Sequence, residues 1–125
     1  MTFRICNAVV ALGCLLAAES ARAHHNFNSV YDLAKRVTLT GTLTKIDWRN
    51  PHIELWIEVK GEQGQAESWV LQGHAPGKSD LLNKASFEKF IGQTVTVSIS
   101  PARKSSLKGV MHTMTFPDGT TLVRK

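Results

Sequence analysis

The stretch that decides the fold is Val37–Val59, VTLTGTLTKIDWRNPHIELWIEV. From position 37 to 44, the odd positions carry Val, Leu, Gly and Leu, and every even position carries Thr. This alternation, rich in β-branched residues, predicts a β-strand with one apolar face. The apolar set then moves to even positions at Ile46 and Trp48. One extra residue near Thr44-Lys45, a β-bulge, would return both sets to the same face and bend the strand.

The remaining chain supplies the other elements of a small barrel. A turn at Asn50-Pro51 leads into the second strand. Further strands are expected at 52–59, 66–72, 94–100, 110–116 and 120–123, with a capped helix over 79–83 and a helical turn over 86–91. Three strands, a small helix and two strands give the β-β-β-α-β-β order of an all-β, OB-like five-stranded Greek-key barrel. An open α+β sheet is the alternative, and the bent first strand favours the barrel.

The N-terminus has the pattern of an export signal. Arg4 precedes a mostly apolar run over 5–18, and Ala21-Arg22-Ala23 supplies a small-x-small cleavage pattern. We therefore expect residues 1–23 to be a signal peptide, 24–36 an N-terminal arm and 37–125 the barrel domain. The mature protein would be periplasmic or secreted, without a transmembrane segment. A loose lipobox ending at Cys14 leaves a lipoprotein as the alternative.

Composition excludes several classes of function. The chain has 125 residues and a net charge of +5, with no dense basic block, which argues against a nucleic-acid partner. Both cysteines, Cys6 and Cys14, lie in the expected signal, so the mature chain has no disulfide and no thiolate ligand. The sequence contains no G-x-S-x-G, P-loop or H-E-x-x-H motif. A non-enzymatic binding protein is therefore the leading expectation.

The expected mature N-terminus suggests a copper site. Cleavage after Ala23 would expose the α-amine of His24, and this amine and the His24 imidazole could chelate one ion. His52 would add a third nitrogen, an arrangement that suits Cu(II). His25 offers a second mode through the intervening amide. A copper-dependent redox enzyme is a further possibility.

Histidine and methionine also occur together near the C-terminus. His112 is expected on an apolar face, while Met111 and Met114 flank it. These three residues could pack in the core, or the thioethers could serve as soft ligands for Cu(I).

Trp56 supports a different kind of binding. It alternates with Glu54 and Glu58, so it is expected on the exposed face of the sheet. Exposed aromatic residues on OB-folds can stack on ligands, and the acidic neighbours disfavour phosphate. The alternative function is therefore a module that binds an envelope polymer or a partner protein around Trp56, together with the basic loop 102–108.

Three motifs resemble a family of small exported bacterial proteins of unknown function. They are Ala23-His24-His25-Asn26-Phe27, the strand start at 37–42 and Trp48-Arg49-Asn50-Pro51-His52. The resemblance implies export and a common fold, and it implies no activity. Family members often read G-S-P-N after the third strand, where this chain has Gly73-His74-Ala75-Pro76. The resemblance therefore implies no role for His74.

Overall fold

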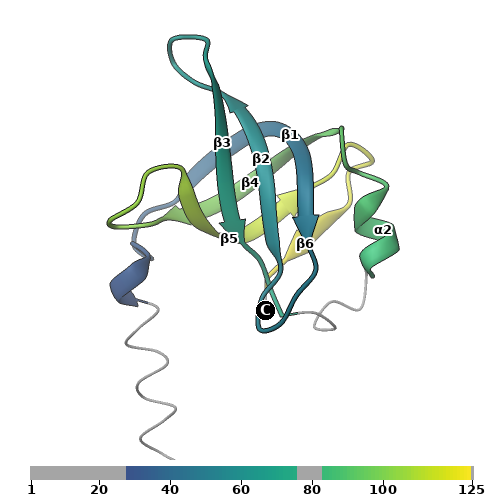
Figure 1. The fold of residues 1–125 in the computed structure, drawn as a ribbon, viewed down its shortest axis with the longest axis horizontal. Helices are drawn as coiled ribbons and strands as arrows, with labels where there is room; N and C mark the ends of the chain where they lie inside the picture. Colours follow the sequence, from purple (N-terminus) through teal and green to yellow (C-terminus); the bar gives the residue numbers. More distant parts are fainter. Residues whose placement is uncertain (1–27, 76–82, 125) are drawn as a thin grey trace, which may run out of the picture. The chain divides into compact units, whose positions relative to one another are not determined.

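A computed structural model describes residues 28–75 and 83–124 of the chain. The chain divides into two compact units, Met1–Val30 and Tyr31–Lys125. Residues 28–30, a helical turn, are the described part of the first unit. The second unit contains β1 (Val37–Asp47), β2 (Glu54–Lys60), β3 (Ala66–Gln72), α2 (Lys84–Glu88), β4 (Thr94–Pro101), β5 (Lys108–Thr115) and β6 (Thr121–Val123) (Figure 1).

The strands of the second unit close into a barrel. Their order is β3-β2-β1-β4-β5-β6, and all these neighbours are antiparallel. A parallel pairing of β3 with β5, through Val70 to Gln72, joins the two sides of the sheet. Five strands thus form a closed ring, and β6 extends it alongside β5. The structure confirms the predicted OB-like all-β barrel with one small helix between β3 and β4.

The predicted bulge is present in β1. Leu43 lies opposite Ile57, and Lys45 lies opposite the next residue back along β2, Trp56. Thr44 is therefore the extra residue, and its hydroxyl donates a hydrogen bond to the Trp56 carbonyl at 3.2 Å. The change of parity read from the sequence is confirmed as a change of register.

An aromatic cluster lies between α2 and the barrel. Phe87 on α2 is fully buried, and its ring lies edge-on to Trp48 and to Phe116, each with 5.6 Å between ring centroids. Asn83 caps the helix by accepting a hydrogen bond from the Ser86 N–H at 2.9 Å. The helix predicted over 79–83 lies outside the described residues except for Asn83. The predicted turn over 86–91 overlaps the end of α2.

In the described part of the chain, 28–75 and 83–124, no helix is both long enough and apolar enough to cross a membrane.

Candidate functional site

The loop that follows β1 is fixed at both of its ends. Trp48 packs against the core, and Ile53 is fully buried. The Ile53 N–H donates to the His74 carbonyl at 3.0 Å, and the Ile53 carbonyl accepts from the Gly73 N–H at 2.8 Å. The residues between, Arg49 to His52, are thereby held at the end of the barrel beside the last residues of β3. The Asn50-Pro51 peptide bond within this loop is cis.

This loop forms one wall of a hollow of about 270 Å³, which we call the His52 hollow. Its lining residues are Arg49, Asn50, Pro51, His52, Glu54 and Gln72. The Arg49 guanidinium forms an ion pair with the Glu54 carboxylate and approaches that of Asp47 at 3.4 Å. Four of the five residues of the W-R-N-P-H motif therefore line one small hollow.

His52 is half-buried in this hollow. Its Nδ1 atom is buried and has no hydrogen-bond partner among the residues that the structure describes. Burial lowers the pKa of His52, and the nearby positive charge of Arg124 lowers it further. The imidazole is therefore neutral at neutral pH, which is the form that binds a metal ion. A buried polar atom without a partner is costly, and such atoms are enriched at functional sites.

Tyr31 and Arg124 also act on the surroundings of His52, although no sequence pattern connects either residue with it. The Tyr31 hydroxyl donates to Gln72 Oε1 at 2.9 Å, so the phenol contacts a wall of the hollow. Burial raises the pKa of the Tyr31 phenol, the Glu54 carboxylate raises it further and Arg124 opposes the change. No periodicity links Tyr31 or Arg124 to His52, since they lie near opposite ends of the chain.

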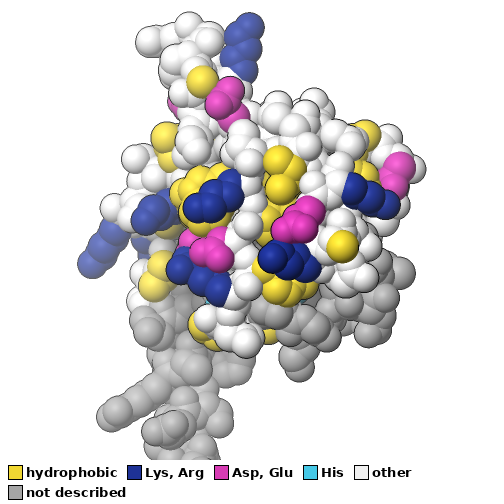
Figure 2. All heavy atoms as spheres, turned by 45° about the vertical axis from the view of Figure 1, so that its right-hand side comes forward, with side chains coloured by type: hydrophobic (Ala, Val, Ile, Leu, Met, Phe, Trp, Pro, Cys, Tyr) yellow, Lys and Arg dark blue, Asp and Glu magenta, His cyan; other side chains and the backbone are white. Residues whose placement is uncertain are grey.

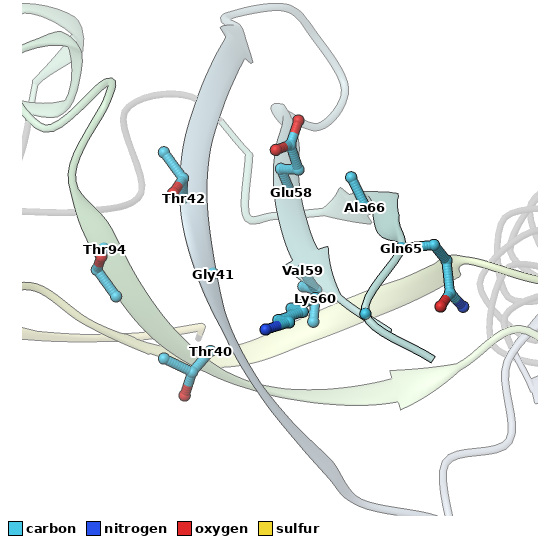
Figure 3. A pocket seen from close by; sticks show the side chains of 10 residues that line it. Thr40, Gly41, Thr42, Glu58, Val59, Lys60, Gln65, Ala66 and Thr94 are labelled. Carbon is cyan, nitrogen blue, oxygen red and sulfur yellow. The ribbon is translucent and has the colours of Figure 1, made fainter. Parts of the chain in front are cut away.

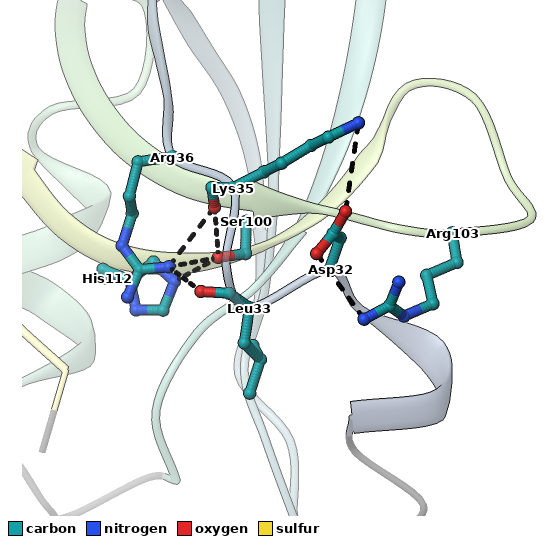
Figure 4. A network of polar contacts seen from close by, with 7 residues as sticks. All are labelled: Asp32, Leu33, Lys35, Arg36, Ser100, Arg103 and His112. Carbon is teal, nitrogen blue, oxygen red and sulfur yellow. Dashed lines mark hydrogen bonds and ion pairs between the residues drawn. The ribbon is translucent and has the colours of Figure 1, made fainter.

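A hydrogen-bond network fixes residues 31–36, the segment that carries Tyr31 (Figure 4). The fully buried Ser100 hydroxyl donates to the Lys35 carbonyl at 2.8 Å and accepts from the Arg36 guanidinium. His112 Nε2 lies 2.8 Å from the Ser100 hydroxyl oxygen. Because the single hydroxyl proton is already used, His112 must donate, so its Nε2 carries the proton.

Backbone pairing extends this attachment along β4. The Asp32 N–H donates to the Pro101 carbonyl at 2.9 Å, and Tyr31 forms a β-bridge with Ala102. The Asp32 carboxylate also pairs with Arg103 at 3.5 Å. The Tyr31 hydroxyl therefore reaches Gln72, in the wall of the His52 hollow, from a firmly held backbone.

The expected alternation of β5 fails at His112. Ile99 lies opposite Met111 and Ser98 lies opposite Thr113, so His112 is an extra residue in the register. This second bulge turns Met111 as well as Met114 into the core, where both are fully buried. The expectation that His112 shares the apolar face with Met114 is wrong. His112 instead lies half-buried at Ser100, and Arg36 and Arg124 join burial in lowering its pKa.

His74 is almost completely buried, at 3% exposure. Its Nδ1 lies 2.8 Å from the Ala75 carbonyl, which can only accept, so Nδ1 carries the proton. The ring lies edge-on to Trp48 and Phe87. His74 thus belongs to the aromatic cluster that joins α2 to the barrel.

Trp56 lies on the outer face of β2, half-buried. The Lys45 ammonium lies 4.5 Å from the centre of its ring. On the face drawn in Figure 2, basic and acidic side chains lie side by side, and hydrophobic side chains form separate patches among them.

The structure brings His52 into a hollow, but the two other predicted copper ligands, His24 and His25, lie outside the described residues. Within 28–75 and 83–124, no group of three or more His, Cys, Asp or Glu side chains gathers in a way that could hold a metal ion. The described residues thus supply one of the three nitrogens that the prediction requires.

Comparison with known proteins places the chain in a family. No curated protein and no solved structure matches it significantly. A family model, described as a family of unknown function, matches residues 12–112 and so includes the W-R-N-P-H motif, all of β1 and the first part of β5. Because this match spans most of the sequence, the chain belongs to the DUF6152 family.

Proposed function

We propose that this protein is an exported β-barrel that binds Cu(II) at the His52 hollow, using the amine and imidazole of His24 together with the His52 imidazole. Residues 1–23 would be removed on export, which makes His24 the first residue. The protein would hold the ion as a binding protein of the cell envelope.

The observation that carries this proposal is the state of His52. A half-buried imidazole lines a small hollow, is neutral at neutral pH and has one buried ring nitrogen without a partner among the described residues. Neutral imidazole nitrogen is a preferred ligand of Cu(II). His74 also has a buried ring nitrogen without a described partner, Nε2, but neither His74 nor His112 lines the His52 hollow.

The proposed site also requires that His24 can reach the His52 hollow. Seven residue steps lead from His24 to Tyr31, and a fully extended chain of this length spans about 25 Å. The Tyr31 hydroxyl is held at Gln72, which lines the same hollow as His52. A segment of this length would let His24 reach the hollow.

The charges around the hollow act in opposite directions. Arg124 is close enough to lower the pKa of His52, and its charge opposes a bound cation. The Glu54 carboxylate in the wall favours one, although it is paired with Arg49. Affinity therefore depends on the His24 chelate, whose amine and imidazole act together.

Titration calorimetry with Cu(II), on protein that begins at His24, tests the proposal. We expect one ion per chain, and His52→Ala should weaken binding at least about tenfold, because a nitrogen ligand is lost. His112→Gln is the matched control, since it removes an imidazole at Ser100 and leaves the hollow intact. Unchanged affinity in His52→Ala would exclude the hollow as the copper site.

The variant His25→Ala distinguishes the two predicted modes of copper chelation. If His24 and His52 hold the ion, His25→Ala should change the affinity less than twofold. A loss in His25→Ala that matches the loss in His52→Ala would assign the ion to the alternative mode through the intervening amide.

The competing proposal, a polymer- or protein-binding face around Trp56, has less support. The ring is half-buried on the outer face of β2, as such a role requires, but Lys45 lies over it. A copper-dependent redox activity has no independent support in the geometry of the described residues.

A further inference from the structure

A second hollow, of about 420 Å³, lies at the β2–β3 hairpin, at the other end of β2 from His52. Its apolar floor is made by Leu39, Val59 and Trp69. Leu39 belongs to the core, whereas Val59 and Trp69 pack against the core and remain partly exposed. An apolar floor that solvent still reaches is typical of a site that covers the apolar face of a ligand.

The polar rim of this hollow is organised by the hairpin itself. The Gly61 N–H donates to the Gln65 carbonyl at 2.7 Å. The Gln65 side chain accepts from the Gln63 N–H at 3.1 Å and donates to Glu67 Oε1 at 3.1 Å. One amide and one carboxylate thus lie beside the apolar floor, joined by a hydrogen bond between side chains that solvent reaches.

Trp69 adds an unused hydrogen-bond donor. Its Nε1 atom is buried and has no partner among the described residues. An indole N–H can only donate, so it requires an acceptor oxygen. Glu67 and Trp69 are two residues apart on β3 and face the same side of the strand. The Trp69 ring and the Glu67 carboxylate therefore lie on the same side of β3, and the indole N–H itself is buried.

A groove of about 370 Å³ adjoins this hollow (Figure 3). The side chains that line both are those of Val59, Lys60 and Gln65. On the side of β1 and β4, the groove presents the hydroxyl groups of Thr40, Thr42 and Thr94. Thr40 and Thr42 alternate with the core residue Leu39 along β1, so the groove opens on the outer face of the sheet and the hollow on the face that carries Leu39, Val59 and Trp69. We call the hollow of about 420 Å³ the hairpin cleft.

We propose that the hairpin cleft binds an uncharged saccharide of several rings. A sugar ring has an apolar C–H face that suits Trp69, and its hydroxyl groups both donate and accept, as the carboxylate and the amide of the rim require. The carboxylates of Glu62 and Glu67 in the rim repel a phosphorylated ligand.

This inference is independent of the copper proposal, because the hairpin cleft and the His52 hollow share no lining residue. Either proposal can fail while the other stands.

Nuclear magnetic resonance on the ¹⁵N-labelled barrel protein tests the inference. The chain has three tryptophans, and Trp69→Phe identifies the indole signal of Trp69. Titration with N-acetylglucosamine trimer and with maltotriose should shift the Trp69 indole signal and leave that of Trp56 in place. Glu67→Gln should raise the Kd about tenfold, because a charge-assisted hydrogen bond is lost. Glu88→Gln, on α2, is the matched control and should leave the Kd unchanged.

Three results would overturn the inference. The first is the absence of a Trp69 shift with either saccharide at millimolar concentration. The second is the same Kd in Glu67→Gln and in the unmodified protein. This comparison does not need the Trp69→Phe variant, so it remains available if that variant does not fold. The third is a Trp69 shift caused by a short extended peptide and by neither saccharide, which would make the cleft a peptide site.

Discussion

The His52 hollow and the hairpin cleft lie at opposite ends of β2, and each contains a buried ring nitrogen without a partner among the described residues. In the His52 hollow the nitrogen belongs to an imidazole, whose ring offers a lone pair. In the hairpin cleft it belongs to the indole of Trp69, which can only donate a hydrogen bond. His74 Nε2 in the aromatic cluster is a third such atom, so this sign does not identify a ligand by itself. The linings differ instead: an imidazole suits a metal ion at one end, and an apolar floor with a polar rim suits an uncharged ligand at the other.

The two ends also differ in how their walls are held. At the His52 hollow, the loop is fixed through Ile53, which is fully buried. At the hairpin cleft, the rim is fixed by hydrogen bonds between polar side chains, such as that from Gln65 to Glu67. The first wall depends on core packing and the second on side chains that can rearrange.

Substitution of one glycine beside each wall compares how tightly the two walls are packed. A Cβ on Gly73 would lie 2.6 Å from Cγ1 of the fully buried Ile53, whereas a Cβ on Gly61 would meet the ends of the Gln65 and Glu67 side chains. We expect Gly73→Ala to lower the free energy of unfolding by about 1–3 kcal/mol, because the core must shift. Gly61→Ala should change it by less than about 0.5 kcal/mol. Urea unfolding followed by tryptophan fluorescence measures both.

Equal losses in the two glycine variants would contradict this distinction. They would show that the hairpin rim is as rigidly packed as the loop that carries His52.

A smaller effect concerns acid stability. The pKa of His112 is lowered from its ordinary 6.5 by burial, Arg36 and Arg124. The unfolded chain therefore binds a proton more readily than the folded protein, so this stability is complete above pH 6.5 and is lost as pH falls toward the lowered value. His112→Gln keeps a donor for Ser100 and removes the titration. Its thermal midpoint should fall less between about pH 7.5 and pH 5 than that of the unmodified protein.

The pKa of His52 is lowered in the same direction, so part of the pH dependence should remain in His112→Gln. An identical loss of the thermal midpoint in both proteins would show that His112 does not contribute.

The first half of the barrel was predictable because its pattern is local. A strict alternation runs from Val37 to Thr44, and the change of parity between Leu43 and Ile46 is enough to indicate the bulge from the sequence. The second bulge was not predictable in this way. Val110, Met111, Met114 and Phe116 are all apolar, so either parity across His112 gives a plausible core face.

The surroundings of His52 depend on contacts that no local pattern encodes. The motif at 48–52 identified the loop, but Tyr31 reaches it from an N-terminal segment and Arg124 from the end of the chain. The polar hydroxyl of Ser100 gives no sign in the sequence that it is fully buried and fixes residues 31–36. Such contacts follow from barrel closure, which brings distant segments together.

The most direct test of the copper proposal is the paramagnetic resonance spectrum of the Cu(II) complex, compared between protein that begins at His24 and protein that retains Ala23. The added residue keeps every imidazole and moves only the terminal amine. We expect the spectrum to change and the affinity to fall, because the amine no longer forms a chelate ring with the His24 imidazole. Identical spectra and affinities would contradict the proposed site.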